Sequence, residues 1–244
     1  MRHTGVMAVH RTARALAREA ITAEIMETAR RQLAVDGAAA LSLRSITREL
    51  GMVSSAIYRY VDSRDDLLTR LIIEAYDSLG GAAEAAVAAT NGRPDAERWV
   101  AAALAIREWA RGRPHEYMLL YGTPVPGYAA PDDTVTPGTR VTLALLSIVR
   151  EAATAGRLSA PVHAVDTPTQ LAYDLERLAS VVDLRVPNSV LLATLAAWTQ
   201  LFGLLSFELS NQTRGVVEDH TALFAATTRL SALSIGLTNR SAAA

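Results

Sequence analysis

The stretch LGMVSSAIYRYVDSRDDLL, residues 50–68, concentrates side chains that can contact a polyanion. A glycine is followed by two serines, and then by two tyrosines with an arginine between them. Small side chains permit close approach to a surface, while hydroxyl and guanidinium groups donate hydrogen bonds to phosphates and base edges. These residue types in this order favour binding to nucleic acid.

Two short helices separated by a glycine must position these side chains. A helix over residues 42–50 capped by Ser42, a turn at Gly51 and a helix over residues 54–61 capped by Ser54 form the helix-turn-helix layout. The second helix would enter a major groove, with Ile57 and Val61 packing inward. An ordinary helical corner, with serines as caps and arginines as solvated surface, is the alternative interpretation of the same pattern.

The candidate DNA-contacting residues fall into three groups by position. Some present small or flexible side chains to base edges, some lie at helix N-termini where backbone N–H groups favour phosphate, and some are long enough to reach either. The set is Ser42, Arg44, Ser54, Ser55, Ala56, Tyr58, Arg59, Tyr60 and Arg64.

Apolar residues recur at helical spacing along most of the chain, and no useful β-alternation is present. We expect an all-α fold, with a three-helix DNA-binding head on a larger helical body. The proline- and glycine-rich segment 122–138 should interrupt the helices. Helices are expected over residues 22–36, with Thr22 as N-cap, and over 42–50, 54–61, 63–89, 95–111, 139–156, 168–182, 187–210 and 217–237.

Charge and composition divide the chain into an arm, a head and a body. Residues 1–70 hold 11 arginines against 8 acidic residues, whereas residues 71–244 hold 13 against 17, so the positive end is expected to meet the polyanion. We expect a flexible basic arm over residues 1–18, a helix-turn-helix domain over 19–66 and a body over 67–240. The arm either reaches into a minor groove or is a solvated extension, and Met7 is an alternative start.

Several function classes are excluded by composition. The chain has no cysteine, no apolar leader and no segment expected to span a membrane, so we expect a cytoplasmic protein with no membrane partner. Its five histidines are scattered outside any metal-binding spacing, and no phosphate loop or nucleophile motif occurs. We therefore expect neither an enzyme nor a cofactor or metal.

The string LSLRSITRELGMVSSAIYRYVDSRDDLL, within residues 22–68, resembles the DNA-binding head of the TetR family of bacterial transcriptional repressors. The resemblance implies that Arg44 and residues 54–56 contact bases, while Ser42, Tyr58, Tyr60 and Arg64 hold phosphates and Arg59 serves either purpose. The family often has lysine at the position of Arg64, which keeps the charge. It often has serine at the position of Val53, so the cap of the second helix is expected to shift to Ser54.

The body resembles one C-terminal branch of the same family through YGTPVPGYAAP (121–131) and WTQLFGLLSFEL (198–209). That branch commonly carries Trp and then His-Gly, but here Phe202 takes the histidine position, so no imidazole role can be transferred. The resemblance implies a pocket for a small-molecule effector in the middle helices. Candidate lining residues are Trp99, Ile106, Tyr117, Met118, Tyr121, Leu175, Trp198 and Phe202. Residues of these types are more often plain core than ligand lining.

The resemblance also implies a homodimer through the last two long helices, about 187–210 and 217–237. The stretch VLLATLAAWTQLFGLLSFEL is apolar around most of its helical circumference, which favours an interface on one side; a core helix of a monomer is the alternative. We expect a repressor that leaves a palindromic double-stranded operator when a small, largely apolar effector binds. The alternative is a constitutive DNA-binding protein whose body serves dimerisation only.

Overall fold

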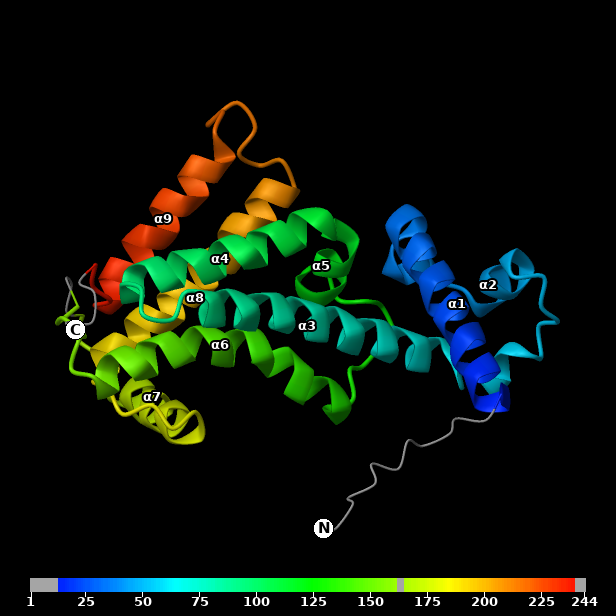
Figure 1. Cartoon of the computed structure of the whole chain (residues 1–244), viewed down its shortest axis with the longest axis horizontal. Helices are drawn as coiled ribbons and strands as arrows, with labels where there is room; N and C mark the ends of the chain where they lie inside the picture. Colours follow the sequence, from blue (N-terminus) through cyan, green and yellow to red (C-terminus); the bar gives the residue numbers. More distant parts are fainter. Residues whose placement is uncertain (1–12, 162–164, 240–244) are drawn as a thin grey trace, which may run out of the picture. The chain divides into compact units, whose positions relative to one another are not determined.

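The computed structural model describes residues 13–161 and 165–239, which form nine α-helices and three short 3-10 helices without any strand (Figure 1). The expected all-α class is confirmed. The chain divides into two compact units. The first, the head, extends to residue 71 and includes the loop segment 124–129. The second, the body, comprises residues 72–123 and those from 130 onward.

The head consists of α1 (Ala13–Asp36), the 3-10 helix η1 (Ala38–Ala40), α2 (Leu43–Glu49), the 3-10 helix η2 (Ile57–Arg59) and the first turns of α3 (Arg64–Ala89). Each helix places its apolar face in one core, because the buried residues recur at the expected spacing. The fully buried members of this core include Ile25, Ala29, Ile46, Ile57, Val61, Leu67 and Leu68.

The start of α1 differs from the prediction. The helix begins at Ala13, so the last six residues of the expected flexible arm are helical, while residues 1–12 lie outside the described part of the chain. Thr22 is therefore not an N-cap. Its hydroxyl instead donates a 2.9 Å hydrogen bond to the carbonyl of Arg18, one turn earlier in the same helix. The helix ends as expected before Gly37, which has a φ of 76°.

The segment expected to be a helix over residues 54–61 is a chain of tight turns around η2. The N–H groups of Ala56, Arg59 and Tyr60 each donate to the carbonyl three residues earlier, while the N–H of Val61 makes an α-type bond to Ile57. Ser54 does not cap it, since the N-cap of η2 is Ala56 and has no side-chain bond. β-Branched and aromatic residues lose side-chain freedom in an α-helix, which favours short 3-10 turns here.

The body consists of the rest of α3, α4 (Asp95–Gly112), α5 (Pro114–Tyr121), the 3-10 helix η3 (Asp132–Thr134), α6 (Val135–Thr154), α7 (Thr169–Val181), α8 (Asn188–Leu209) and α9 (His220–Ile235). Helices α8 and α9 lie side by side, and α4 packs against both of them and against α6 (Figure 1). Aromatic and branched side chains from these helices form one continuous core, with Trp99, Ile106, Tyr117, Leu145 and Phe224 among its largest members.

Two body helices depart from the expected boundaries. The sequence does not predict α5, because a proline after residue 111 indicates the end of a helix, whereas Pro114 is the first residue of the next one. Helix α6 begins at Val135, inside the segment expected to be a loop, with Pro137 in its first turn. Proline is tolerated there because N–H groups in the first turn of a helix have no intrahelical partner.

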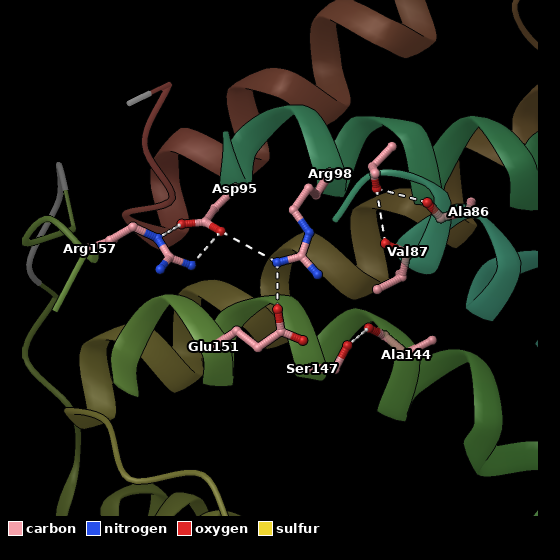
Figure 2. A network of polar contacts seen from close by, with 9 residues as sticks. Ala86, Val87, Asp95, Arg98, Ala144, Ser147, Glu151 and Arg157 are labelled. Atoms are coloured by element: carbon pink, nitrogen blue, oxygen red, sulfur yellow. Dashed lines mark hydrogen bonds and ion pairs between the residues drawn. The ribbon is translucent and has the colours of Figure 1, made fainter. Parts of the chain in front are cut away.

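A polar network centred on the buried side chains of Asp95 and Arg98 joins the start of α4 to the end of α6 (Figure 2). Asp95, with 1% of its surface exposed, accepts two hydrogen bonds from Arg157, at 2.7 and 3.0 Å. Arg98 donates to Glu151 at 2.6 Å and lies 3.6 Å from Asp95. The N–H of Ala96 also bonds the carbonyl of Thr238, so the chain after α9 is held at the same place.

The sequence-based expectation that no segment is long and apolar enough to span a membrane is wrong for α8. Among the described residues it is the one helix long and apolar enough to cross a membrane, by length and composition only. It packs against α4, α7 and α9, and Leu191, Ala197, Leu201 and Leu205 are buried. Core helices of this kind meet the same criterion, so the finding is weak support for a membrane span.

Candidate nucleic-acid interface and body cavity

Helix α2 presents Arg44 and is capped as predicted. Ser42 is its N-cap, and its hydroxyl accepts the N–H of Ser45 at 3.5 Å. Arg44, in the first turn, is exposed, while Ile46 and Thr47 are buried beneath it. The helix therefore turns a cationic side chain outward at its N-terminal end, where anions are favoured.

The residues after Gly51 form an outward-facing turn. Gly51, with a φ of 64°, reverses the chain, and Ile57 and Val61 anchor the segment in the core. The side chains of Ser54, Ser55 and Arg59 are exposed, and Tyr58 exposes 58% of its surface, whereas Ala56 and Tyr60 are partly buried. The structure thus presents the predicted small and hydroxyl side chains to solvent, on a shorter scaffold than the α-helix expected.

Arg18 supports this turn from α1. Its guanidinium donates a 3.1 Å hydrogen bond to the carbonyl of Arg59, at the end of η2. A cation near the C-terminal end of a helical turn stabilises its free carbonyl groups. The sequence does not predict this contact, because Arg18 falls in the expected flexible arm and nothing in the spacing pairs residues 41 positions apart.

Arg64 uses its guanidinium within the head. It donates to the carbonyl of Leu41 at 3.1 Å and to those of Ala38 and Ala39 at 3.0 and 3.2 Å. Its side chain thereby fixes η1 and the approach to α2. A phosphate contact by Arg64 remains a prediction, and the carbonyl bonds reduce what its guanidinium can offer.

The start of α3 is capped from both sides. Ser63 accepts the N–H of Asp66 at 3.0 Å, and the Asp66 carboxylate accepts the N–H of Asp62 at 2.9 Å. Ser63 therefore caps α3, in an arrangement close to a capping box. On the next turn, the hydroxyl of Thr69 lies 2.9 Å from that of Tyr128, so the segment 124–129 is part of the head.

The body contains an apolar cavity of about 270 Å³ between α4, α6, α7 and α8. Leucine, valine, tryptophan and threonine side chains form its wall, and no charged group occurs among the described lining residues. Its volume lies just below the range of roughly 300–1,000 Å³ common for small-molecule pockets. The lining residues are Trp99, Thr142, Leu145, Leu146, Leu178, Val182, Leu191, Thr194, Leu195 and Trp198.

Two of the eight predicted pocket residues, Trp99 and Trp198, line this cavity. The other six occupy different places. Four of them are buried in the core, namely Ile106, Tyr117, Leu175 and Phe202. Tyr121 is partly buried, and Met118 is 46% exposed. The sequence does not predict the lining residues of α6 and α7, because leucine and valine at helical spacing carry no signal that separates a cavity wall from a filled core.

An aromatic row connects the cavity wall to α3 within the body. The ring of Trp198 lies 5.5 Å from that of Phe202, which lies 4.3 Å from that of Tyr121. Tyr121 in turn lies 6.2 Å from Tyr76 on α3, in an edge-to-face arrangement. Phe202, at the position where the resembling branch has histidine, therefore acts as a stacking residue.

Helices α8 and α9 keep apolar surface exposed in the single chain. On α8, Phe207 is 58% exposed, and Ala196 and Gly203 are also open to solvent. On α9, Leu230 is 63% exposed and Leu233 37%. Apolar residues grouped on two neighbouring helices are typical of a protein–protein interface, and the small residues permit close helix approach.

A capped helix-turn-helix head and an all-helical body are typical of DNA-binding transcriptional regulators. Comparisons with known proteins agree. Residues 25–71 match the family described as bacterial regulatory proteins, tetR family, and residues 99–230 match the tetracyclin repressor-like C-terminal domain. Together these matches extend over both units.

The chain belongs to the TetR family. It is 39% identical over 218 residues to an HTH-type transcriptional regulator of Mycobacterium tuberculosis, Rv1816, covering 88% of this chain and 92% of that protein. The crystal structure of the putative regulatory protein SCO4313 is 35% identical, with a TM-score of 0.72 over 90% of this chain and 98% of that one. PfmR from Thermus thermophilus shares the fold at 17% identity, with a TM-score of 0.55, 83% coverage of this chain and 94% of its own.

Proposed function

We propose that this TetR-family regulator is a cytoplasmic homodimeric repressor that binds a palindromic operator and is released by a small, largely apolar effector. The observation that carries the proposal is the pairing of an exposed helix-turn-helix surface in the head with an uncharged cavity in the body. A ligand acts on DNA binding only through its different affinity for the two states of the protein.

In the head, exposure and charge support a division of roles. Arg44, Ser54 and Ser55 would read base edges, because they are exposed and are either cationic or small. Ala56, which is partly buried, would join them as a small side chain that permits close approach. Phosphates would be held by Ser42, Tyr58, Tyr60 and the α3 terminus at Arg64, and Arg59 would serve either role. Two such heads in a dimer would meet half-sites about 34–36 Å apart, one duplex turn.

A constitutive DNA-binding protein with a purely dimerising body is the second candidate. It would be favoured by a filled interior, whereas the body holds a cavity of about 270 Å³ with an apolar wall. A cavity of this kind costs stability when empty, since its lining loses dispersion contacts. The effector-responsive function is therefore the better supported of the two.

Selection of bound duplexes from the genomic neighbourhood of the coding sequence, repeated with Arg44→Ala and Tyr58→Ala, tests the proposal. Loss of Arg44 should relax base preference at one position by about 1–3 kcal/mol. Loss of Tyr58 should weaken binding to all sequences alike, because a phosphate contact carries no base preference. Arg177→Ala, an exposed α7 arginine paired with Asp174, is the control and should change neither property.

Two results would contradict the proposal. Recovery of no specific duplex by the wild-type chain would exclude sequence-specific regulation. Recovery of a single, non-repeated half-site would exclude the symmetric operator. Addition of apolar compounds to the operator complex then distinguishes the two candidate functions, because only the effector-responsive protein releases DNA.

A further inference from the structure

A second hollow in the body, of about 440 Å³, is lined by charged side chains. It lies between the turn that joins α3 to α4, the start of α4 and the end of α6. We call it the arginine pocket, and its charged wall consists of Arg93, Asp95, Arg98, Arg150, Glu151 and Arg157. The surplus of positive charge is local, because residues 71–244 as a whole hold 17 acidic residues against 13 arginines.

Two of the four arginines neutralise both carboxylates of the wall. Arg157 donates two hydrogen bonds to Asp95, and Arg98 donates one to Glu151 (Figure 2). Asp95 and Arg98 are buried, at 1% and 3% exposed, so this part of the wall is held inside the body. Because each carboxylate already has a cation, the remaining two guanidinium groups determine the charge that a ligand meets.

Arg93 and Arg150 have no acidic partner in the described part of the chain. Arg93 precedes α4, is exposed, and makes no side-chain hydrogen bond or ion pair there. Arg150, on α6, is partly buried and donates Nε and Nη2 to the carbonyls of Asp183 and Val182, at 3.2 and 2.6 Å. These carbonyls carry no net charge, and Nη1 of Arg150 is not used by them. The pocket therefore presents two uncompensated positive charges with free N–H donors.

Charge, geometry and volume together favour a phosphate group as the ligand. Guanidinium groups bind phosphate oxygens through paired N–H donors, and a phosphate monoester carries a charge of about −1.5 to −2 at neutral pH. A hollow lined by charge of one sign also concentrates the opposite ion. The volume of about 440 Å³ lies in the range of roughly 300–1,000 Å³ common for small-molecule pockets. An organic group attached to the phosphate can therefore be accommodated.

We propose that the arginine pocket is a second ligand site, which binds a phosphate dianion, either free or as a small phosphate monoester, through Arg93 and Arg150. The proposal goes beyond release by an apolar effector, because this ligand is charged and the cavity between α4, α6, α7 and α8 is not. The two sites share α4 and α6, since Arg98 adjoins Trp99 and Arg150 follows Leu146 by about one turn.

Calorimetry with the full chain at constant ionic strength tests the proposal with three probes: glucose 6-phosphate, inorganic phosphate and glucose. At least one of the two phosphates should bind the wild type with a dissociation constant below about 1 mM. Glucose should not bind detectably, because it lacks the anion. Tighter binding of glucose 6-phosphate than of inorganic phosphate would identify a monoester as the ligand, and the reverse order would identify free phosphate.

Arg93→Gln is the decisive variant, because the exposed Arg93 side chain has no partner in the described chain whose loss could disturb folding. It should weaken phosphate binding at least about tenfold, the effect of losing a hydrogen bond between charged groups. Arg150→Gln should weaken binding similarly, although it also loses the bonds to the chain after α7. Arg177→Gln removes the same charge from the exposed side of α7, outside the pocket. This control should retain its affinity within about twofold, because salt screens distant exposed charges.

Failure of both phosphates to bind the wild type would overturn the proposal. So would an affinity that is unchanged in Arg93→Gln and Arg150→Gln, or one that falls equally in Arg93→Gln and Arg177→Gln. Operator binding measured in parallel separates this result from the proposed function. A chain that binds phosphate through Arg93 but recognises no operator would support the second site and contradict the repressor, whereas operator binding without phosphate binding would overturn the second site alone.

Discussion

Arg64 has a charge that suits DNA, and its guanidinium bonds within the head. Its guanidinium donates to three backbone carbonyls, those of Leu41, Ala38 and Ala39. Each of these carbonyls belongs to η1 or to the residue after it, and that of Ala38 also accepts the N–H of Leu41. The side chain therefore determines where α2 begins, and through α2 the position of Arg44.

Arg64→Met should destabilise the head by about 2 kcal/mol, because hydrogen bonds from a charged donor to backbone carbonyls are lost. The salt dependence of operator binding should change little. One lost phosphate contact would lower the slope of log K against log salt by about 0.9. Urea unfolding and fluorescence anisotropy at several salt concentrations measure the two effects. A slope reduced by about 0.9 with unchanged stability would instead assign Arg64 to phosphate.

For single residues of the head, the sequence predicts which side chains face outward but not which groups they hydrogen-bond. Exposure of Arg44, Ser54 and Tyr58 follows from helical spacing and from the inward positions of Ile57 and Val61. The bonds of Arg64 and Arg18 join residues more than 20 positions apart, and residue type alone does not specify such pairings. The role expected of Arg64 follows from its charge and could not include carbonyls contributed by η1.

At the scale of elements, α4 and α6 are joined through a carboxylate that water does not reach. Asp95 is 1% exposed and bonds Arg157 directly, and the same network includes Arg98 and Glu151 (Figure 2). The hydrogen bond to Asp95 raises the pKa of the Arg157 guanidinium above its ordinary value. The charged form of Arg157 is thus stabilised by a carboxylate that has no access to solvent.

Asp95→Asn should destabilise the body by about 3–5 kcal/mol, because the carboxylate of a buried ion pair is removed. Arg157 then loses its ion partner, whereas Arg98 keeps Glu151. Asp174→Asn is the control. Asp174 pairs with Arg177 on the exposed side of α7, and such pairs contribute about 0–1 kcal/mol. Thermal unfolding of the two variants should separate them clearly. Equal stability of both variants would show that the buried network is replaceable by neutral hydrogen bonds.

The aromatic row between α3, α5 and α8 predicts a loss of stability in alkali. Burial raises the pKa of the hydroxyl groups of Tyr76, Tyr117 and Tyr121 above the ordinary value of 10.0. Between pH 10 and these raised values, the unfolded chain releases protons that the folded chain retains. Stability is therefore complete below about pH 10 and falls as the pH rises through the folded values.

Urea unfolding at about pH 8 and about pH 11 measures this dependence. The free energy of unfolding should fall by at least about 1 kcal/mol, since one pKa unit corresponds to about 1.36 kcal/mol. Tyr121→Phe removes one of the three hydroxyl groups while retaining the ring that stacks on Phe202, and it should reduce the fall. A pH dependence identical in the variant and the wild type would show that the Tyr121 hydroxyl does not contribute.

Apolar spacing predicts helix positions well where it is long and regular, as in α3, α4, α7 and α8. Helix boundaries are predicted wrongly where the helix is short or has a proline in its first turn. Pro114 and Pro137 both occur in the first turn of a helix, a position indistinguishable by composition from a loop. The sequence indicates the cavity only through its two tryptophans, because the cavity volume depends on how α6 and α7 pack against α8.

At the scale of the whole molecule, the exposed faces of α8 and α9 argue for a second copy of the chain. Phe207 and Leu230 leave 58% and 63% of their surfaces in water in the single chain. Each would gain on burial about 25 cal/mol per Å² of apolar surface. A two-fold axis through these helices would apply every such contact twice, so single substitutions there should have doubled effects.

Phe207→Glu and Leu230→Glu should each raise the dimer dissociation constant at least about tenfold, because each places two charges in an apolar interface. Val135→Glu is the control, since Val135 is 59% exposed on α6 and lies on neither helix. Sedimentation over a series of concentrations should give dissociation constants for the two interface variants at least about tenfold above that of the control. Operator affinity should fall with dimerisation, because a monomer occupies one half-site. Dimers that persist in both interface variants would place the interface elsewhere and contradict the assignment to α8 and α9.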